Sequence, residues 1–142
     1  MGADMGRRFL TRLAVRVGDI NYGGHLGNDK FLLFFHEARL NFLTDLGFSE
    51  QYIGAGVSVT QVEAFIKYQS QAFLHDELEI VVWVSEFSRA RFRLEYEMTR
   101  PSDGKAIASG YTVLAGFDYK RNRPERIPDQ FKQTVERYQN TL

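Results

Sequence analysis

Residue types with catalytic potential gather in one short segment, Gly18 to Gly27. Asp19, Asn21 and His25 lie there within seven residues, beside four glycines. A carboxylate can act as a base, an amide or imidazole can position water, and glycines let a substrate approach the backbone closely. The spacing predicts a catalytic turn. An ordinary loop, in which Asp19 caps the turn and His25 only donates a hydrogen bond, stays open as the alternative.

The element that would position this turn is a helix expected to begin at Asn28. Asn is a favoured N-cap, and Asp29 places negative charge where the helix dipole is positive. The segment that follows, including FLLFF, is apolar around most of a helical circumference, so we expect a buried helix. Gly47 should end it in the C′ position. Unpaired N–H groups at its start could bind a developing oxyanion.

The rest of the chain reads mostly as strands. Period-two patterns and β-rich composition predict strands over Phe9 to Val17, Val57 to Tyr68, Glu77 to Phe87, Arg91 to Thr99 and Lys105 to Tyr119, and a polar helix from Pro128 to Leu142. Ser88 to Ala90 and Pro101 to Gly104 read as connecting turns. This order predicts an α+β fold in which an antiparallel sheet curls around the helix, as a single domain over residues 1–142.

Composition excludes several classes of function. Lys plus Arg and Asp plus Glu both number 18, so no nucleic-acid or membrane partner is expected, and self-association is plausible. There is no cysteine, which excludes disulfides and thiol nucleophiles. Met1 to Arg8 contains no apolar core of signal-peptide length, and we expect a cytoplasmic protein. His75-Asp76-Glu77 lacks a second histidine at ligand spacing, so no metal is expected.

Other charged residues are weaker candidates. Glu37 and Arg39 lie inside the helix expected to be buried, where an ion pair is the favoured role. Glu63 lies in a strand and is interpreted as a solvent-side residue. Arg89, Arg91 and Arg93 surround a hairpin turn, where they could bind a phosphate-bearing ligand or form a solvated edge.

The run from Val15 to Arg39 resembles the signature of the 4-hydroxybenzoyl-CoA thioesterase-like family, which are hotdog-fold acyl-CoA thioesterases. The matching residues of this segment are Val15, Arg16, Asp19, Asn21, Gly24, His25, Asn28, Glu37, Ala38 and Arg39. Downstream, Tyr68 to Leu78 matches with His75 in place of the usual Gly. The ending matches at Arg123, Pro124, Ile127 and Pro128. The resemblance therefore spans nearly the whole chain.

The resemblance implies a five-stranded antiparallel sheet wrapped around a central helix, in a homodimer or homotetramer with active sites at subunit interfaces. It implies hydrolysis of an acyl-CoA thioester to free acid and CoA, without a further cofactor. The N–H groups of Gly24, His25 and Leu26 would bind the carbonyl oxygen. Tyr22 and Asn28 would also contact substrate, and Arg89 and Arg91 are candidates for the CoA phosphates.

One departure from the family pattern concerns the catalytic carboxylate, because many members have Asp where this chain has Asn21. An amide is neither a nucleophile nor a strong base. Asp19 could then act as the base with Asn21 and His25 as positioners, which is the favoured hypothesis, or Glu37 or Glu63, from either subunit, could reach the site from another direction. Alternatively, the chain binds acyl thioesters without hydrolysing them. A hotdog dehydratase or hydratase is a third hypothesis, ranked below these.

Overall fold

The computed structural model describes residues 6–141. The expectation about Met1 to Arg8 therefore falls mostly outside the described residues, as does Leu142. Within the described range, no helix is long and apolar enough to cross a membrane.

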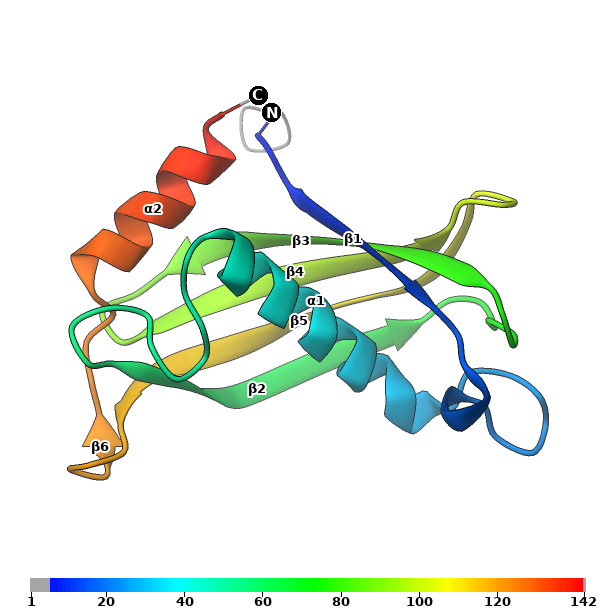
Figure 1. Ribbon diagram of the computed structural model, residues 1–142, viewed down its shortest axis with the longest axis horizontal. Coiled ribbons are helices and arrows are strands. Elements are labelled where there is room, and N and C mark those ends of the chain that lie inside the picture. The colour runs from blue at the N-terminus through cyan, green and yellow to red at the C-terminus, as the bar shows by residue number, and fades with distance from the viewer. Residues whose placement is uncertain (1–5, 142) are drawn as a thin grey trace.

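One antiparallel sheet forms the body of the fold (Figure 1). Its strands are β1 (Phe9–Ala14), β2 (Ser58–Tyr68), β3 (Glu77–Phe87), β4 (Arg91–Arg100) and β5 (Lys105–Asp118), in the spatial order β1-β3-β4-β5-β2, with the short β6 (Arg123–Pro124) paired to β5. Helix α1 (Phe31–Asp45) crosses one face of the sheet, and α2 (Asp129–Gln139) packs beyond one end of α1. The α+β class and the five-stranded sheet wrapped around a long helix are confirmed.

The segment between β1 and α1 contains less regular secondary structure than expected. β1 ends at Ala14 rather than Val17, because a 3-10 turn, η2 (Val17–Asp19), follows it. The Asp19 N–H donates to the Arg16 carbonyl at 2.9 Å and closes that turn. The chain therefore leaves the sheet earlier, which frees the residues that build the candidate site.

The predicted helix start at Asn28 is wrong. A 3-10 turn, η3 (Asn28–Lys30), comes first, and α1 begins at Phe31 with no side-chain cap. The predicted end is confirmed: Gly47 has φ +89°, and the Phe48 N–H donates to the Leu43 carbonyl at 2.8 Å. This pairing satisfies a carbonyl of the last turn, as a glycine at C′ permits.

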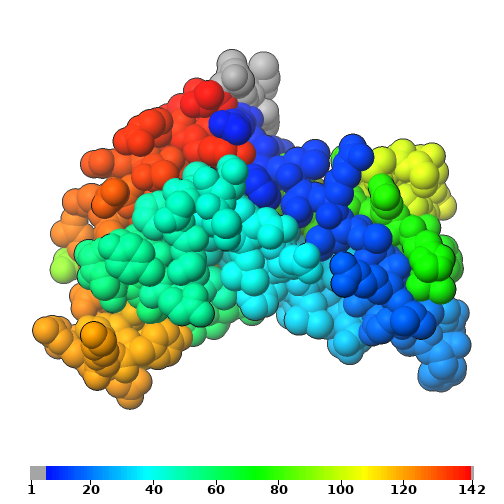
Figure 2. Space-filling model, viewed as in Figure 1, coloured from blue at the N-terminus to red at the C-terminus, as the bar shows by residue number. Residues whose placement is uncertain are grey.

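Burial of α1 is confined to one side. The buried side chains that face the sheet are Phe31, Phe34, Phe35, Ala38, Arg39, Phe42 and Leu43. On the outer side Leu32, Leu33 and Leu40 are 38%, 54% and 37% exposed, and Figure 2 shows this segment (cyan) open at the surface. The expectation of a helix buried all round is therefore wrong for a single chain, whose outer leucines are left uncovered.

His75 has an unusual backbone conformation. Its φ of +73° lies in the left-handed region, and the side chain is exposed. Because glycine adopts this region without the clash that a Cβ causes, we expect His75→Gly to raise the free energy of unfolding by about 1 kcal/mol. Chemical denaturation would measure this change. His75→Ala is the control and should not stabilise; equal stabilisation by both variants would contradict the backbone explanation.

Candidate active site

Backbone hydrogen bonds hold the turn from Asp19 to Asn28 in place. The Gly27 N–H donates to the Asp19 carbonyl at 3.1 Å, and the Asn21 N–H donates to the His25 carbonyl at 3.0 Å. The Leu26 N–H donates to the Ala72 carbonyl at 2.8 Å, which ties the turn to the segment before β3. A Cβ at Gly27 would lie 2.7 Å from Asp29 Oδ1, so a larger residue there would displace the Asp29 side chain. The turn is thus a fixed structure that enters η3.

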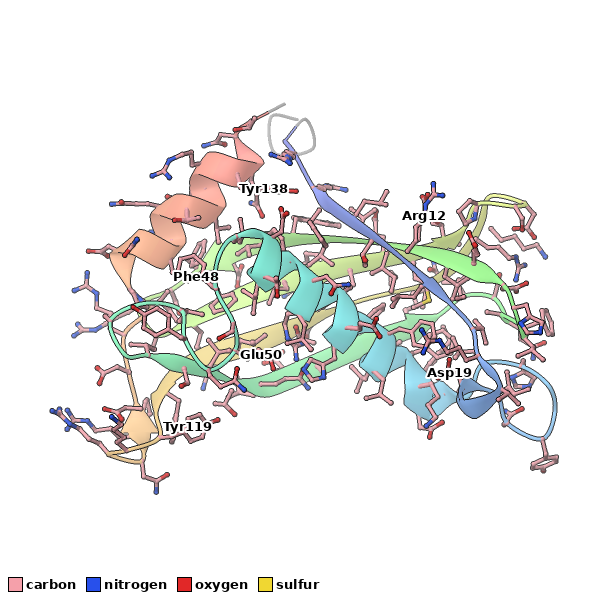
Figure 3. All side chains as sticks on the ribbon, viewed as in Figure 1. Arg12, Asp19, Phe48, Glu50, Tyr119 and Tyr138 are labelled. Carbon is pink, nitrogen blue, oxygen red and sulfur yellow. The ribbon has the colours of Figure 1, made fainter. Side chains whose placement is uncertain are left out.

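Asp19 presents one free carboxylate oxygen. Its Oδ2 accepts from the Arg16 N–H at 2.9 Å, and its Oδ1 has no hydrogen-bond partner in the described chain. The residue is half-buried, at the N-terminal end of α1 (Figure 3). A carboxylate held on one side by a backbone donor and open on the other can take a proton from a water molecule.

Asn21 and His25 contact each other across the turn. Asn21 Oδ1 accepts from the Gly23 N–H at 2.9 Å, which directs its Nδ2 toward His25 Nδ1 at 3.5 Å. The same ring nitrogen lies 3.4 Å from the Leu26 carbonyl. These two contacts need opposite tautomers, because Nδ1 accepts from an amide but donates to a carbonyl. The Asn21 contact leaves the ring proton on Nε2, where it can be donated to a ligand.

The three N–H groups expected to bind a carbonyl oxygen differ in availability. The Gly24 N–H donates to the Asn21 carbonyl at 2.9 Å, and the Leu26 N–H is held by Ala72. The His25 N–H has no acceptor in the described part of the chain. Of the three, His25 is therefore the one that can donate to a bound oxygen without breaking a hydrogen bond.

A cavity of about 280 Å³ adjoins His25. Its walls are His25, Leu26, Asn28 and Phe31 on one side and Tyr68 to Gln71, which follow β2, on the other. The Tyr68 hydroxyl donates to the Asn28 carbonyl at 3.3 Å, and its ring meets Phe31 edge-on with centroids 5.0 Å apart. Sequence reasoning missed Tyr68 and Phe31, because nothing in the sequence shows that the end of β2 returns to the start of α1. Asp19 and Asn21 lie outside this wall, and Tyr22 is 108% exposed.

The two alternative carboxylates lie away from this cavity. Glu63 Oε2 accepts from the Tyr111 hydroxyl at 2.9 Å. The neighbouring Thr112 side chain accepts from Arg39 of α1, so Tyr111 and Glu63 lie on the opposite face of the sheet. Glu37 is exposed on the outer side of α1. Neither reaches the His25 cavity of its own chain.

Arg39 forms an ion pair, but Glu37 is not its partner. Its Nε donates to Glu50 Oε2 at 2.7 Å, and its Nη1 donates to Gln61 Oε1 at 3.1 Å and to the Tyr96 hydroxyl at 3.2 Å. Burial alone would lower the pKa of Arg39, but Tyr96 and Glu50 outweigh it and raise the pKa. Burial alone would raise the pKa of Glu50, but Arg39 and His36 lower it. Both members of the pair are therefore charged.

Arg89 and Arg91 lie at the other end of the sheet. Both are exposed, and the Ile127 N–H donates to the Arg89 carbonyl at 2.9 Å, beside the β5–β6 hairpin. In Figure 3, Tyr119 of that hairpin and Asp19 lie at opposite ends of the molecule. These arginines are therefore remote from the His25 cavity of the same chain.

Comparison with known protein families identifies the superfamily to which this chain belongs. A family model described as the thioesterase-like superfamily matches residues 15–135, which include the turn, α1 and the whole sheet from β2 to β6. The chain belongs to the thioesterase-like superfamily. Other members of this superfamily are therefore the proteins with which the turn at Asp19 and the cavity at His25 are to be compared.

Known proteins similar to this member of the superfamily include one curated relative. An L-carnitine dehydrogenase/betainyl-CoA thioesterase from Agrobacterium fabrum (strain C58 / ATCC 33970) is 26% identical over 119 residues, covering 84% of this chain and 24% of the relative. The chain thus spans about a quarter of the length of that relative.

Solved structures show the same fold. A 1,4-dihydroxy-2-naphthoyl-CoA thioesterase from Synechocystis superposes with a TM-score of 0.82 at 21% identity, covering 91% of this chain and 96% of the other. A hypothetical protein from Staphylococcus aureus in complex with CoA gives a TM-score of 0.85 at 18% identity, covering 96% and 89%. These likenesses confirm the hotdog fold.

Proposed function

We propose that the protein hydrolyses an acyl-CoA thioester to a free acid and CoA. The observation that carries the proposal is the superfamily match over residues 15–135, which includes a turn with a free carboxylate oxygen on Asp19 and an unpaired N–H on His25. The named thioesterases among similar structures and the CoA bound in one of them support the same substrate class. No cofactor is proposed, and a cytoplasmic location stays a prediction.

In the proposed reaction, Asp19 acts as the general base. Its free Oδ1 takes a proton from water while the water oxygen attacks the thioester carbon, and the His25 N–H stabilises the resulting oxyanion. Asn21 and His25 position the water and the thioester. The C–S bond then breaks, and the proton held by Asp19 passes to the CoA sulfur, which leaves a free thiol and a carboxylic acid.

The direct test of the function is release of free CoA. Purified protein would be mixed with a panel of straight-chain, branched and aromatic acyl-CoA thioesters and a thiol-reactive chromophore. We expect turnover well above the spontaneous rate for at least one thioester. Saturable binding without CoA release from any thioester would favour the second candidate, a non-hydrolytic acyl-thioester binding protein, which Asn21 at the usual catalytic position suggests.

We also propose that two copies associate through β2. This strand is an edge of the sheet and 11 residues long, and its exposed side chains include Val62 and Phe65, at 43% and 51% exposure. An edge of this length is a template for pairing with another strand. Leu32 and Leu33 share a groove with Val59 to Gln61, so a second copy on β2 would also cover these outer leucines of α1.

Charges on both copies of this edge should separate the dimer. We expect Val62→Lys/Phe65→Lys to shift the molar mass from dimer to monomer without unfolding, because both side chains are exposed and like charges would face each other. Light scattering after size-exclusion chromatography measures the mass. Leu10→Lys on β1, the opposite edge, is the matched control. A monomer from the control and a dimer from the double variant would contradict pairing through β2.

Such a dimer would bring a basic hairpin to the site. β2 runs from Ser58, which pairs with Phe117 near the hairpin, to Tyr68, which contacts Asn28. A two-fold axis reverses the strand, so the hairpin of the second copy would lie beside the His25 cavity of the first. Basic residues at this end of the fold include Arg89, Arg91, Lys120, Arg121, Arg123 and Arg126. We propose that they bind the CoA phosphates.

Removing charge from this hairpin should weaken CoA binding selectively. We expect Lys120→Ala/Arg123→Ala to raise KM for an acyl-CoA by about 10-fold with little change in kcat, because each lost contact is a charge-assisted hydrogen bond. Steady-state kinetics would measure both constants. An acyl thioester of N-acetylcysteamine, which lacks phosphates, should show no change, and Arg137→Ala on α2 is the control variant. An equal effect on both thioesters would contradict phosphate binding.

A further inference from the structure

The connection from Gln71 to Asp76, between β2 and β3, supports the turn that carries His25. The Leu26 N–H donates to the Ala72 carbonyl at 2.8 Å, and His25 and Phe73 form an isolated antiparallel bridge. The first residue of the connection also lies in the wall of the His25 cavity. The direction of the His25 N–H and the width of the cavity therefore both depend on where this connection lies.

Arg100, at the end of β4, holds the connection through two hydrogen bonds from one nitrogen. Its Nη1 donates to the Gln71 carbonyl at 3.1 Å and to Asp76 Oδ2 at 2.8 Å. The same Asp76 oxygen accepts from the Phe73 N–H at 2.9 Å, so one carboxylate oxygen joins Arg100 to the backbone beside His25. Only 10% of the Arg100 side chain is exposed, and charge-assisted hydrogen bonds in such a place are strong and little screened by salt.

A second carboxylate binds the other side of Arg100. Arg100 Nε donates to Asp103 Oδ1 at 3.1 Å, and Nη2 donates to Asp103 Oδ2 at 2.9 Å. Asp103 also accepts from the Lys105 N–H at 3.1 Å, within the turn between β4 and β5. In Figure 1 this turn lies at the same end of the sheet as the connection before β3. Of the two carboxylates that share Arg100, Asp76 is the one that continues to the site.

We propose that Arg100 and Asp76 are positioning residues for the hydrolysis, which fix the His25 N–H where the oxyanion forms. This inference rests on the proposed thioester hydrolysis. Neither side chain lines the His25 cavity, so both act through the backbone from Gln71 to Asp76. A displacement of about 1 Å at a reacting site can cost about 100-fold in rate. Because the oxyanion exists only in the transition state, a displaced donor lowers kcat and leaves KM nearly unchanged.

Asp76→Ala and Asp103→Ala form a matched pair, because each removes one carboxylate from Arg100. We expect Asp76→Ala to lower kcat for an acyl-CoA thioester by about 10-fold, with KM within about 2-fold of wild type, and Asp103→Ala to change neither constant. Asp76→Asn should keep most of the rate, because its amide oxygen can accept from both Arg100 and the Phe73 N–H. An unchanged kcat in Asp76→Ala, or an equal loss in Asp103→Ala or in Asp76→Asn, would overturn the inference.

Hydrogen exchange at the Leu26 amide tests the positioning without any catalysis. This N–H is protected by the Ala72 carbonyl, so its exchange rate reports how often the turn leaves the connection. Nuclear magnetic resonance would measure the rate, divided by the rates of amides in the centre of β4, which report opening of the whole fold. We expect the quotient to rise about 10-fold in Asp76→Ala and to stay at the wild-type value in Asp103→Ala. A wild-type quotient in both variants, or an equal rise in both, would overturn the inference.

Asp76→Glu covers the case in which Asp76→Ala does not fold. It keeps the charge opposite Arg100 but moves the carboxylate by one methylene away from the Phe73 N–H. It then takes the place of Asp76→Ala in both measurements, with the same expected and contradicting results. If the wild-type protein hydrolyses no thioester, the proposed function fails, and the exchange rates decide the inference alone.

Discussion

Asp19→Asn is expected to lower kcat for acyl-CoA hydrolysis by about 100-fold or more, because a carboxamide cannot take the proton of the attacking water. The variant should still fold, since its amide oxygen can accept the Arg16 N–H as the carboxylate does now. Steady-state kinetics measures the loss, and the thermal unfolding midpoint checks that the turn is intact.

Asn21→Asp is the matched comparison for this variant. It places a carboxylate at the position where the resemblance to the 4-hydroxybenzoyl-CoA thioesterase-like family implies one, so in the Asp19→Asn background it should restore part of the rate. Near wild-type kcat in Asp19→Asn alone would contradict Asp19 as the base. If the wild-type protein has no activity and the Asn21→Asp change alone creates activity, the result would instead support the non-hydrolytic alternative.

Glu50→Ala should lower the free energy of unfolding by about 3–5 kcal/mol. It would leave the Arg39 guanidinium charged in the core, with only the neutral oxygens of Gln61, Tyr96 and Thr112 as acceptors. Chemical denaturation measures the difference. Arg12→Ala is the control, because Arg12 pairs with Glu79 at 2.6 Å but is 63% exposed, and its loss should cost less than about 1 kcal/mol.

The same ion pair predicts how stability depends on pH. Burial alone would raise the pKa of Glu50, but Arg39 and His36 lower it in the folded protein. A lowered folded pKa gives stability that is present above the unfolded value, about 4.3, and is lost as the pH falls through the folded value. The stability difference between wild type and Glu50→Gln should therefore narrow below about pH 4. A difference that grows on acidification would contradict a charged Glu50.

The sequence predicts elements whose pattern is local. β3 was expected at Glu77 to Phe87 and has those bounds, because apolar and polar residues alternate and a tight turn ends it. Gly47 at the end of α1 is confirmed for a similarly local reason, since only a residue tolerant of positive φ suits that position. The predicted start of α1 is wrong because the η3 turn takes the place of a capped first turn. A residue that favours the N-cap position, such as Asn28, does not by itself make a side-chain cap form.

Features that depend on contacts between distant segments could not be predicted from the sequence. Glu50 lies in the loop after α1, and nothing in its local sequence shows that it pairs with Arg39. Tyr68 contacts Asn28 across forty positions of sequence, so the His25 cavity could not be outlined. The outer leucines of α1 were expected to be buried because periodicity reports how apolar a helix is, and not which chain covers it.

The most direct test of the central claim is a crystal structure with a non-hydrolysable acyl-CoA analogue that keeps its carbonyl group. The measured quantity is the distance from the analogue carbonyl oxygen to the nearest protein donors. We expect it within hydrogen-bond distance of the His25 N–H, in the cavity between Phe31 and Tyr68, with a water molecule between the carbonyl carbon and Asp19 Oδ1. An analogue whose carbonyl lies elsewhere, such as the cavity beside α2 lined by Trp83 and Lys132, would contradict the account.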